Sequence, residues 1–237
     1  MLLLAAGRGR RFGGAVPKVF LDLAGKPVLL HSAERLIQTS RLPGVDWTSE
    51  LVVVVSPHDR QQLLAPLLPA LTALGAQIID GGSSRQESMR RGLAAASPDC
   101  ELVVVHDAAR PLFDPKAAHR CIECARSTGA AILASPVADT IKRATQDGLV
   151  QTTVDRSALW AAQTPQVVQR PLLHRALDHA DLHALAVTDE SSFVEAVGGK
   201  VALVESSQSN LKITRRSDLA IAKALLQAAD DSPENAT

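Results

Sequence analysis

Two hydrophobic patterns alternate along the first two thirds of the chain. Wholly apolar runs such as 51–55 and 102–105 are typical of strands buried on both faces of a parallel sheet. Longer stretches of mixed polarity, each opened by a capping residue or a proline, separate these runs and predict helices. We expect further strands at 77–80 and 130–135, and helices at 28–39, 57–74, 84–96, 115–127, 171–183 and 217–229, with a short helix after residue 190. This alternation predicts an α/β fold with a doubly wound, mostly parallel sheet.

Residues 137–159 break the alternation. The segments 139–143 and 150–154 look like strands joined by Gln146-Asp147-Gly148, which is a hairpin signal. An isolated two-stranded ribbon is marginally stable in water, so we expect it to pack against something. A second subunit in a two-fold homodimer would provide that surface; the alternative is a hairpin folded back on its own domain.

The remaining segments complete a single domain over residues 1–229, in which 137–159 is a β-arm. Two more strands are expected at 201–205 and 210–214, and Ser217 is expected to cap the last helix. The polar tail 230–237 is expected to be disordered. The sequence shows no internal repeat and no linker between two domains.

Composition limits the classes of function. The chain has 237 residues, 46% of them hydrophobic, and a formal net charge of zero at pI 7.1, so no global charge draws it to nucleic acid or to an anionic membrane. We see no transmembrane stretch and no signal peptide, which makes the cytoplasm the expected location. Cys100, Cys121 and Cys124 are expected to be buried reduced thiols rather than metal ligands or a redox pair.

Charge is concentrated locally, in the glycine-rich turn near the N-terminus. This turn carries Arg8, Arg10 and Arg11, with Lys18 following, and contains no acidic residue. Small residues let a phosphate approach backbone N–H groups, and the cations add full charges, so the pattern predicts a polyphosphate site. The dinucleotide fingerprint fails because Phe12 stands where its third glycine should be, and no Walker pattern is present. The alternative is an ordinary strand-to-helix connection.

Two other loops share the character of this first one. The segments 81–88 and 106–111 also follow predicted strands and are rich in small or charged residues. Ligands bind at the carboxyl ends of the strands in sheets of this type, so the three loops are expected to meet there. Asp107, directly after an apolar strand, is therefore expected to be functional, although it could merely cap the next turn.

A set of motifs extends over nearly the whole chain: Ala5-Ala-Gly-Arg-Gly-Arg-Arg11, Pro17-Lys18, Asp80-Gly-Gly82, Arg85 with Ser88, His106-Asp-Ala-Ala-Arg-Pro111, Pro136-Val-Ala-Asp-Thr-Ile-Lys142, Val154-Asp-Arg156, Thr164-Pro-Gln166, Thr188-Asp-Glu190, Lys212-Ile-Thr214 and Asp218-Leu219. In this order they resemble the 2-C-methyl-D-erythritol 4-phosphate cytidylyltransferase family. The first motif indicates only the broader nucleotidyltransferase group. Its combination with the ribbon, Thr-Pro-Gln and Lys-Ile-Thr is specific.

The resemblance implies a reaction in which CTP and methylerythritol 4-phosphate give a cytidine diphosphate ester and pyrophosphate, with Mg2+. A phosphate monoester is largely dianionic at neutral pH, because its second pKa is near 6, so the nucleophile needs no general base. The chemical problem is to bring two anions together, and cations, amides and Mg2+ solve it. His106 is accordingly expected to be structural.

The resemblance also implies roles for individual residues. Arg11 and Lys18 would stabilise the transition state and the departing pyrophosphate; Arg156, from the partner's ribbon, and Lys212 would hold the 4-phosphate in line. The CTP site would comprise Ala5, Ala6, Gly7, Gly81, Gly82, Ser83, Ser88, Asp107 and Ala108. Asp107 would also help to bind Mg2+ or the substrate diol. The methylerythritol pocket would be lined by Arg110, Thr140, Thr164 and Thr188.

Several residues have simpler interpretations, and the chain departs from the family pattern in places. A lone Arg or Lys is usually a solvated surface charge, Thr164-Pro165 could be only a turn, and Thr188-Asp189 only a helix cap. The stretch before Ala5 is shorter than is usual in the family, so we expect a short first strand or a start further upstream. Ser83 and Ser209 stand where the family often has an acidic residue.

Three other functions remain open at this point. A cytidylyltransferase for another polyol phosphate, such as ribitol 5-phosphate, would share the CTP loops and differ in the acceptor pocket. A nicotinamide-dependent oxidoreductase is disfavoured by the broken glycine fingerprint and by the lack of an acid after Val55. A non-catalytic nucleotide-binding module would have no use for Arg156 and Lys212 together.

Overall fold

The computed structural model of the chain describes residues 1–7, 12, 16–183 and 189–230. Arg11, Thr188 and the expected disordered tail from residue 231 onward lie outside the described residues. The α-helices are α1 (Val28–Thr39), α2 (Pro57–Leu63), α3 (Leu68–Ala73), α4 (Arg85–Ala95), α5 (Pro115–Thr128), α6 (Arg170–Leu182), α7 (Glu190–Ala196) and α8 (Arg216–Asp230). Two short 3-10 helices are η1 (Lys18–Phe20) and η2 (Ala65–Leu67).

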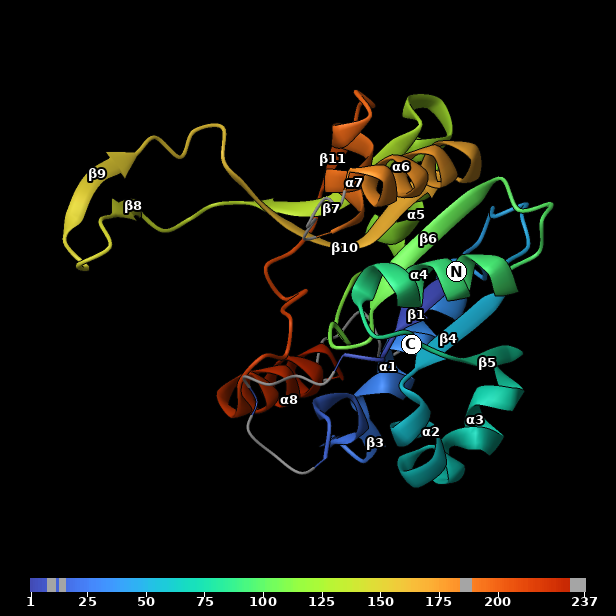
Figure 1. The fold of residues 1–237 in the computed structure, drawn as a ribbon. Coiled ribbons are helices and arrows are strands. Elements are labelled where there is room, and N and C mark those ends of the chain that lie inside the picture. Colours follow the sequence, from blue (N-terminus) through green and yellow to red (C-terminus); the bar gives the residue numbers. More distant parts are fainter. Residues whose placement is uncertain (8–11, 13–15, 184–188, 231–237) are drawn as a thin grey trace.

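A seven-stranded sheet forms the centre of the described part of the chain (Figure 1). Its order is β11 (Ala202–Glu205), β7 (Ala130–Pro136), β10 (Trp160–Gln169), β6 (Leu102–Asp107), β1 (Leu2–Leu4), β4 (Leu51–Val55) and β5 (Ala76–Asp80). All neighbouring strands are parallel except β10, which is antiparallel to both β6 and β7. The predicted mostly parallel α/β sheet is therefore confirmed.

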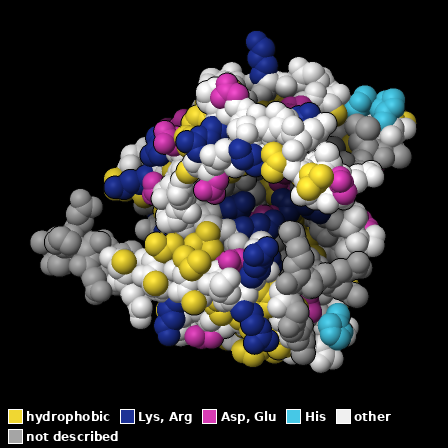
Figure 2. Space-filling view, turned by 90° about the vertical axis from the view of Figure 1, so that its left-hand side faces the viewer, with side chains coloured by type: hydrophobic (Ala, Val, Ile, Leu, Met, Phe, Trp, Pro, Cys, Tyr) yellow, Lys and Arg dark blue, Asp and Glu magenta, His cyan; other side chains and the backbone are white. Residues whose placement is uncertain are grey.

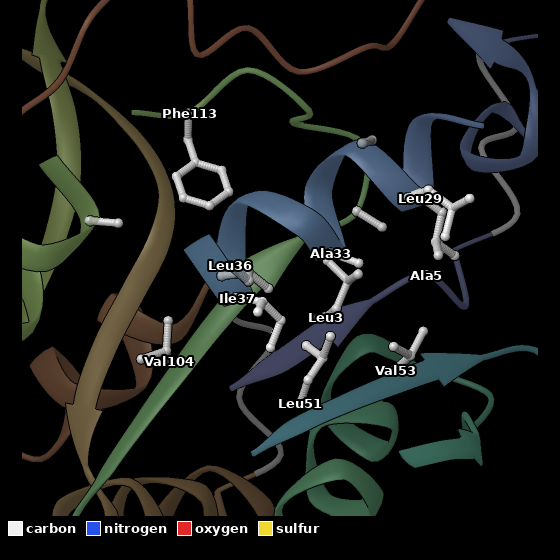
Figure 3. Packing of buried hydrophobic residues seen from close by; sticks show 14 of the residues in the cluster. Leu3, Ala5, Leu29, Ala33, Leu36, Ile37, Leu51, Val53, Val104 and Phe113 are labelled. Atoms are coloured by element: carbon white, nitrogen blue, oxygen red, sulfur yellow. The ribbon is translucent and has the colours of Figure 1, made fainter. Parts of the chain in front are cut away.

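Helices cover both faces of this sheet, which explains the wholly apolar strands. Along β4, alternate side chains belong to different hydrophobic clusters: Val53 belongs to the cluster that includes residues of α1 and α5, whereas Val52 belongs to the one that includes residues of α4 and α6. Figure 3 shows α1 lying across the strands with its apolar side chains facing Leu3 and Leu51. Because both faces are buried, no position along β4 is exposed to solvent, and the polar alternation of a half-exposed strand is absent.

The predicted helix at 57–74 is wrong in one respect, because the chain forms α2, η2 and α3 in succession there. Pro66 and Pro69 lack the N–H group that a continuous helix needs, and each lies in the first turn of a new helix, where that N–H is not required. The start is as expected: the Ser56 side chain caps α2 by accepting a hydrogen bond from the Asp59 N–H at 3.1 Å.

In the C-terminal half, one strand was not expected and two expectations need correction. Strand β10 was not predicted, because its sequence mixes polar and apolar residues without a regular period. Residues 210–214 form no strand; the Ile213 N–H donates to the Ala109 carbonyl oxygen at 2.8 Å, beside the loop after β6 instead of along a sheet edge. Helix α8 begins at Arg216, so Ser217 lies inside its first turn and is not its cap.

The β-arm extends away from the central sheet (Figure 1). Its strands β8 (Ile141–Ala144) and β9 (Val150–Val154) pair antiparallel, and the turn contains Gly148 with φ +83°. The hairpin prediction is therefore confirmed, and the arm is not folded back on its own sheet. Leu149 and Val150, near the turn, each keep 65% of their surface exposed.

Two smaller features complete the fold. Strands β2 (Asp22–Leu23) and β3 (Lys26–Pro27) form a short antiparallel pair that the sequence did not predict. Cys100, Cys121 and Cys124 are free thiols, as expected, although only Cys121 is fully buried. No helix in the described residues is long and apolar enough to cross a membrane.

Candidate functional site

The described parts of the three loops predicted to meet at the carboxyl edge of the sheet lie together there; residues 8–11 and 13–15 of the first loop are outside the described residues. Ala5 follows β1, Gly81 follows β5, and Asp107 is the last residue of β6. A Cβ atom on Gly81 would lie 2.6 Å from the Ala6 Cβ, closer than such atoms approach one another. The two loops proposed to hold CTP therefore touch, and only glycine fits at this contact.

The second of these loops is held in place by the first turns of α4. The Gly82 N–H donates to the Ser88 Oγ at 3.0 Å, and the Ser88 hydroxyl donates to the Ser84 carbonyl oxygen at 2.8 Å. The Ser83 N–H and hydroxyl both donate to Glu87 Oε2, and these hydrogen bonds lower the Glu87 pKa. Ser84 is the N-cap, as expected of a capping box, but Glu87 bonds the Ser83 N–H instead of that of Ser84.

Asp107 is the centre of a charged cluster. Its Oδ1 accepts a hydrogen bond from Arg85 Nη1 at 2.6 Å, and its Oδ2 accepts one from Lys212 Nζ at 2.6 Å. Burial raises the Asp107 pKa, but the charges of Arg85 and then Lys212 together outweigh burial and hold the pKa well below its usual value. Asp107 is therefore ionised at neutral pH and lies between two cations.

Arg85 also binds a second carboxylate, that of Glu190 at the start of α7. Arg85 Nε lies 3.1 Å from Glu190 Oε1, and Arg85 Nη2 lies 2.9 Å from Oε2. Glu190 is fully buried; burial raises its pKa, and the charge of Arg85 opposes that shift. A buried ion pair contributes little net stability. The effect of this pair is on conformation, because it holds the Arg85 guanidinium between α7 and β6.

A neutral histidine lies behind Asp107. The Thr164 Oγ1 accepts a hydrogen bond from the Asp107 N–H at 3.1 Å and lies 2.9 Å from His106 Nδ1, while His106 Nε2 lies 3.0 Å from the Arg110 carbonyl oxygen. A carbonyl oxygen can only accept, so we assign the ring proton to Nε2. Burial lowers the His106 pKa to about 3, so the ring is neutral at physiological pH.

Thr164 reaches His106 because β10 is irregular at this point. In the pairing of β10 with β7, Ala162 faces Ala134, but the next registered pair is Gln166 with Ile132. The intervening residues form a bulge that contains the cis Thr164-Pro165 peptide bond. Bulges commonly redirect side chains next to functional sites.

Arg110 and Asn210 connect the bulge to the segment that carries Lys212. Arg110 Nη1 donates to the Asn210 carbonyl oxygen at 2.7 Å, and burial lowers the Arg110 pKa. The Asn210 amide donates to Gln163 Oε1 at 2.8 Å and to the Thr164 carbonyl oxygen at 2.9 Å. Among the described residues, Arg110 Nε and Asn210 Oδ1 are buried without a hydrogen-bond partner.

The structure also describes three further candidate residues, Ala108, Gly7 and Lys18. Ala108 is fully buried; its N–H donates to the Leu4 carbonyl oxygen and its own carbonyl accepts from the Ser32 hydroxyl. Gly7 is exposed after β1, and Lys18 is half-buried at the start of η1. Ala108 therefore ties the end of β6 to β1 and α1.

Thr140 and Arg156 are on the exposed β-arm. Arg156 Nη1 donates to the Ala138 carbonyl oxygen, and the Thr140 side chain is exposed. In the part of the chain that the structure describes, no hydrogen bond or ion pair joins either residue to the Asp107 cluster. The chain therefore does not bring these two residues to its own cluster.

The cluster is suited to binding anions. Arg85, Arg110 and Lys212 come from separate elements and gather around Asp107, and Figure 2 shows basic side chains around a hollow on the face toward which the β-arm extends. A cavity of about 450 Å³ adjoins Lys212. It is lined by Gln208, Ser209, Leu211, Lys212, Thr214, Asp218, Ile221 and Leu225.

Asp107 is the residue that the sequence suggested for Mg2+. Among the described residues, no group of three or more His, Cys, Asp or Glu side chains is placed to hold an ion. Mg2+ is often bound by one or two carboxylates together with substrate phosphates and water. Asp107 fits that pattern as a single carboxylate, provided that phosphates complete the coordination.

Three residues at or beside the cluster are not evident from the sequence. Glu190 and Arg85 belong to motifs that imply no role for them, and Asn210 belongs to a segment whose sequence predicts only a strand. A glutamate that opens a helix usually faces solvent, so nothing local indicates that Glu190 is fully buried. Asp189, by contrast, is the helix cap that its position suggested, because it accepts from the Ser192 N–H at 3.1 Å.

Comparison with known proteins gives a consistent result. A family model described as "IspD: 2-C-methyl-D-erythritol 4-phosphate cytidylyltransferase" matches residues 1–228. A protein of Chromobacterium violaceum with the same enzyme name is 45% identical over 235 residues, covering 97% of this chain and 98% of that protein. The crystal structure of the Thermus thermophilus enzyme of that name aligns with a TM-score of 0.75 at 33% identity, covering 95% of this chain and 98% of that one.

Proposed function

This chain belongs to the 2-C-methyl-D-erythritol 4-phosphate cytidylyltransferase family, and we propose that the charged cluster around Asp107 is where it joins its two substrates. The enzyme uses CTP and 2-C-methyl-D-erythritol 4-phosphate and forms 4-diphosphocytidyl-2C-methyl-D-erythritol and pyrophosphate, in non-mevalonate isoprenoid synthesis. The matching family model and relatives carry this name, and not that of a ribitol 5-phosphate enzyme or a nicotinamide-dependent oxidoreductase.

We place the site where basic side chains from different elements come together. Three cations, Arg85, Arg110 and Lys212, converge at the carboxyl edge of the sheet, next to the contact between the loops at Ala6 and Gly81. Preorganised charges of this kind stabilise an anionic transition state without having to reorganise during the reaction.

The chemistry of the cluster supports attack by a phosphate that is already ionised. His106, the nearest imidazole, has both ring nitrogens engaged and a pKa of about 3, so it is unsuited to act as a general base. The phosphate dianion needs no base. The cluster instead provides positive charge. That charge reduces the repulsion between the two anions, so that the substrate phosphate can attack the CTP α-phosphate in line.

We assign the nucleotide to the loops on the α4 side. Gly81 has no side chain and packs against Ala6, so the loop after β5 lies directly beside the loop after β1, and the exposed Ser83 follows next along it. Ser88 would act through Gly82, because its hydroxyl already donates to Ser84 and accepts from the Gly82 N–H. Arg11 and Lys18 remain our candidates for the triphosphate and the departing pyrophosphate.

We assign the acceptor to the side of the cluster that carries Lys212. Lys212 would exchange part of its contact with Asp107 for a contact with the incoming phosphate. Asn210 connects Arg110 and Thr164 to the segment that carries Lys212. Thr188 remains a candidate for the same pocket. Asp107 stays paired with Arg85 while Lys212 changes partner, so the carboxylate is not left buried without a cation.

Mg2+ is proposed as the cofactor, and Asp107 is the residue that would hold it. A bound ion would neutralise charge on the nucleotide phosphates. Asp107 is ionised and lies at the carboxyl end of β6, beside the proposed nucleotide loops.

We also infer a homodimer in which each β-arm reaches the other subunit. The arm exposes Leu149 and Val150 at its end, and an isolated ribbon gains stability only by packing on another surface. Arg156 and Thr140 would then serve the partner's acceptor site, which explains why the arm carries them away from the cluster of their own chain. A cytoplasmic location is proposed because the substrates are small soluble phosphates.

Turnover of the purified protein tests the proposed function. Pyrophosphate release would be measured with CTP, UTP, ATP and GTP, each combined with methylerythritol 4-phosphate or ribitol 5-phosphate. We expect release with CTP and methylerythritol 4-phosphate, and little with the other combinations. A clear preference for ribitol 5-phosphate, or binding of NAD without any turnover of CTP, would overturn the assignment.

A further inference from the structure

Lys212 lies in a segment that has no regular secondary structure. Residues 206–215 connect β11 to α8 without a helix or strand. A segment of this kind lacks the regular hydrogen bonds that hold the backbone of a helix or a strand. A lysine side chain also loses much rotamer freedom when it is held in one place. Lys212 Nζ nevertheless lies 2.6 Å from Asp107 Oδ2. Other contacts must therefore fix the backbone on both sides of Lys212.

One of these contacts follows Lys212 directly. Ile213 is fully buried, and its N–H donates to the Ala109 carbonyl oxygen at 2.8 Å. Ala109 lies two residues after Asp107 in the loop that follows β6. This contact therefore anchors the C-terminal side of Lys212 to the same loop that carries its ion-pair partner.

Contacts on the other side of Lys212 are made by Asn210, two residues before it. Asn210 is 1% exposed, and its amide donates two hydrogen bonds into the β10 bulge, to Gln163 Oε1 at 2.8 Å and to the Thr164 carbonyl oxygen at 2.9 Å. Its own carbonyl oxygen accepts from Arg110 Nη1 at 2.7 Å. One buried residue thus links the segment of Lys212 to the bulge and to Arg110.

We propose that Asn210 is a positioning residue for the acceptor site: it holds Lys212 in reach of the acceptor phosphate while it aligns Thr164 and Arg110 beside it. Asn210 does not touch the reacting atoms. The inference rests on the proposed function, because that function assigns Lys212 to the acceptor phosphate. Among the described residues, no hydrogen bond joins Asn210 to the loops at Ala6 and Gly81, whereas three join it to Gln163, Thr164 and Arg110, so we expect its effect to fall on the acceptor.

Substitution Asn210→Asp tests this inference. Aspartate has nearly the same shape, but it replaces the two donated hydrogen bonds with repulsion from Gln163 Oε1 and the Thr164 carbonyl oxygen. We expect kcat/KM for methylerythritol 4-phosphate to fall about 10- to 100-fold, the scale for misplacing a group that positions the substrate. The Kd for CTP, measured by calorimetry, should not change. Asn210→Ser, which removes the amide without adding charge, is the second variant if the first does not fold.

A matched control separates positioning from simple stabilisation. Thr39 is also 1% exposed, and its hydroxyl donates to the Arg35 carbonyl oxygen at 2.9 Å within α1. Thr39→Val removes a buried hydrogen bond without touching the cluster. It should lower the urea midpoint and leave the KM for the acceptor unchanged.

A double variant identifies the group through which Asn210 acts. In a Lys212→Ala background, Asn210→Asp should lower kcat/KM for the acceptor little further, because the cation it positions is already gone. The inference is overturned if Asn210→Asp and Asn210→Ser keep the wild-type acceptor KM and kcat, or if the Asn210→Asp loss persists in full without Lys212. A wild-type protein that releases no pyrophosphate would overturn the proposed function itself, and this inference with it.

Discussion

Glu190 is fully buried and accepts two hydrogen bonds from Arg85, at 3.1 Å and 2.9 Å. Arg85 is thereby kept in place for its third contact, to Asp107 at 2.6 Å. The pair joins the start of α7 to the first turn of α4. One guanidinium therefore connects α4, α7 and the carboxyl end of β6.

Glu190→Gln should destabilise the protein strongly. Removing one partner of a buried ion pair leaves the other charge poorly compensated and typically costs about 3–5 kcal/mol. Urea denaturation at pH 7 would measure the loss. The control is Lys26→Met, because Lys26 and Glu34 form an exposed pair at 2.7 Å, and such pairs contribute less than about 1 kcal/mol. Equal losses for the two variants would contradict the interpretation of Glu190.

Lys18→Ala should slow turnover without unfolding the protein. Lys18 is half-buried at the start of η1, and if it stabilises charge on the departing pyrophosphate, its loss should add about 2–4 kcal/mol to the activation barrier. Steady-state pyrophosphate release measures the change, with the exposed Lys116→Ala as a control on α5. Turnover equal to that of the wild type would rule out the role of Lys18.

Subunits with different defects should restore activity to each other if the β-arm acts on the partner. A heterodimer of an Arg156→Ala subunit and a Lys18→Ala subunit contains one site with both residues intact, provided that Arg156 serves the opposite subunit. Differently tagged subunits would be co-expressed, and the mixed dimer purified with both tags before assay. A verified heterodimer as inactive as either parent would indicate that each site is built from one chain.

Folding stability should fall on acidification because of His106. Its pKa is about 3 in the folded protein, and the unfolded chain takes up a proton on this histidine near pH 6.5. The unfolded state therefore binds more protons between these pH values, so stability is complete above about pH 6.5 and declines as the pH falls toward 3. At pH 5 the loss is about 2 kcal/mol relative to pH 7.

His106→Gln provides the comparison for this pH effect. Glutamine can keep a donor and an acceptor near Thr164 and the Arg110 carbonyl oxygen, but it does not titrate. Urea unfolding at pH 7 and pH 5 should show a smaller difference for the variant than for the wild type. The same pH dependence in both proteins would mean that other groups cause it.

Local sequence was sufficient for most helices and strands. The helix at 28–39 and the strand at 51–55 were predicted with their observed bounds, because amphipathic spacing and wholly apolar runs are properties of neighbouring residues. The hairpin at Gly148 was equally evident, because the turn needs a residue that tolerates positive φ. The helix predicted at 57–74 failed where Pro66 and Pro69 interrupt it, although both prolines could have been given more weight.

The type of sheet, the loops at its carboxyl edge and the family could be predicted from the residues alone, since each depends on residue types at short spacing. Three contacts could be known only from the folded chain: Glu190 is buried against Arg85, Lys212 lies against Asp107, and a bulge in β10 directs Thr164 to His106. Residues 210–214 show the difference: their apolar alternation suits a strand, but Asn210 and Ile213 hold them beside other loops. Such contacts join residues far apart in the chain, so they depend on how the elements pack and not on local preference.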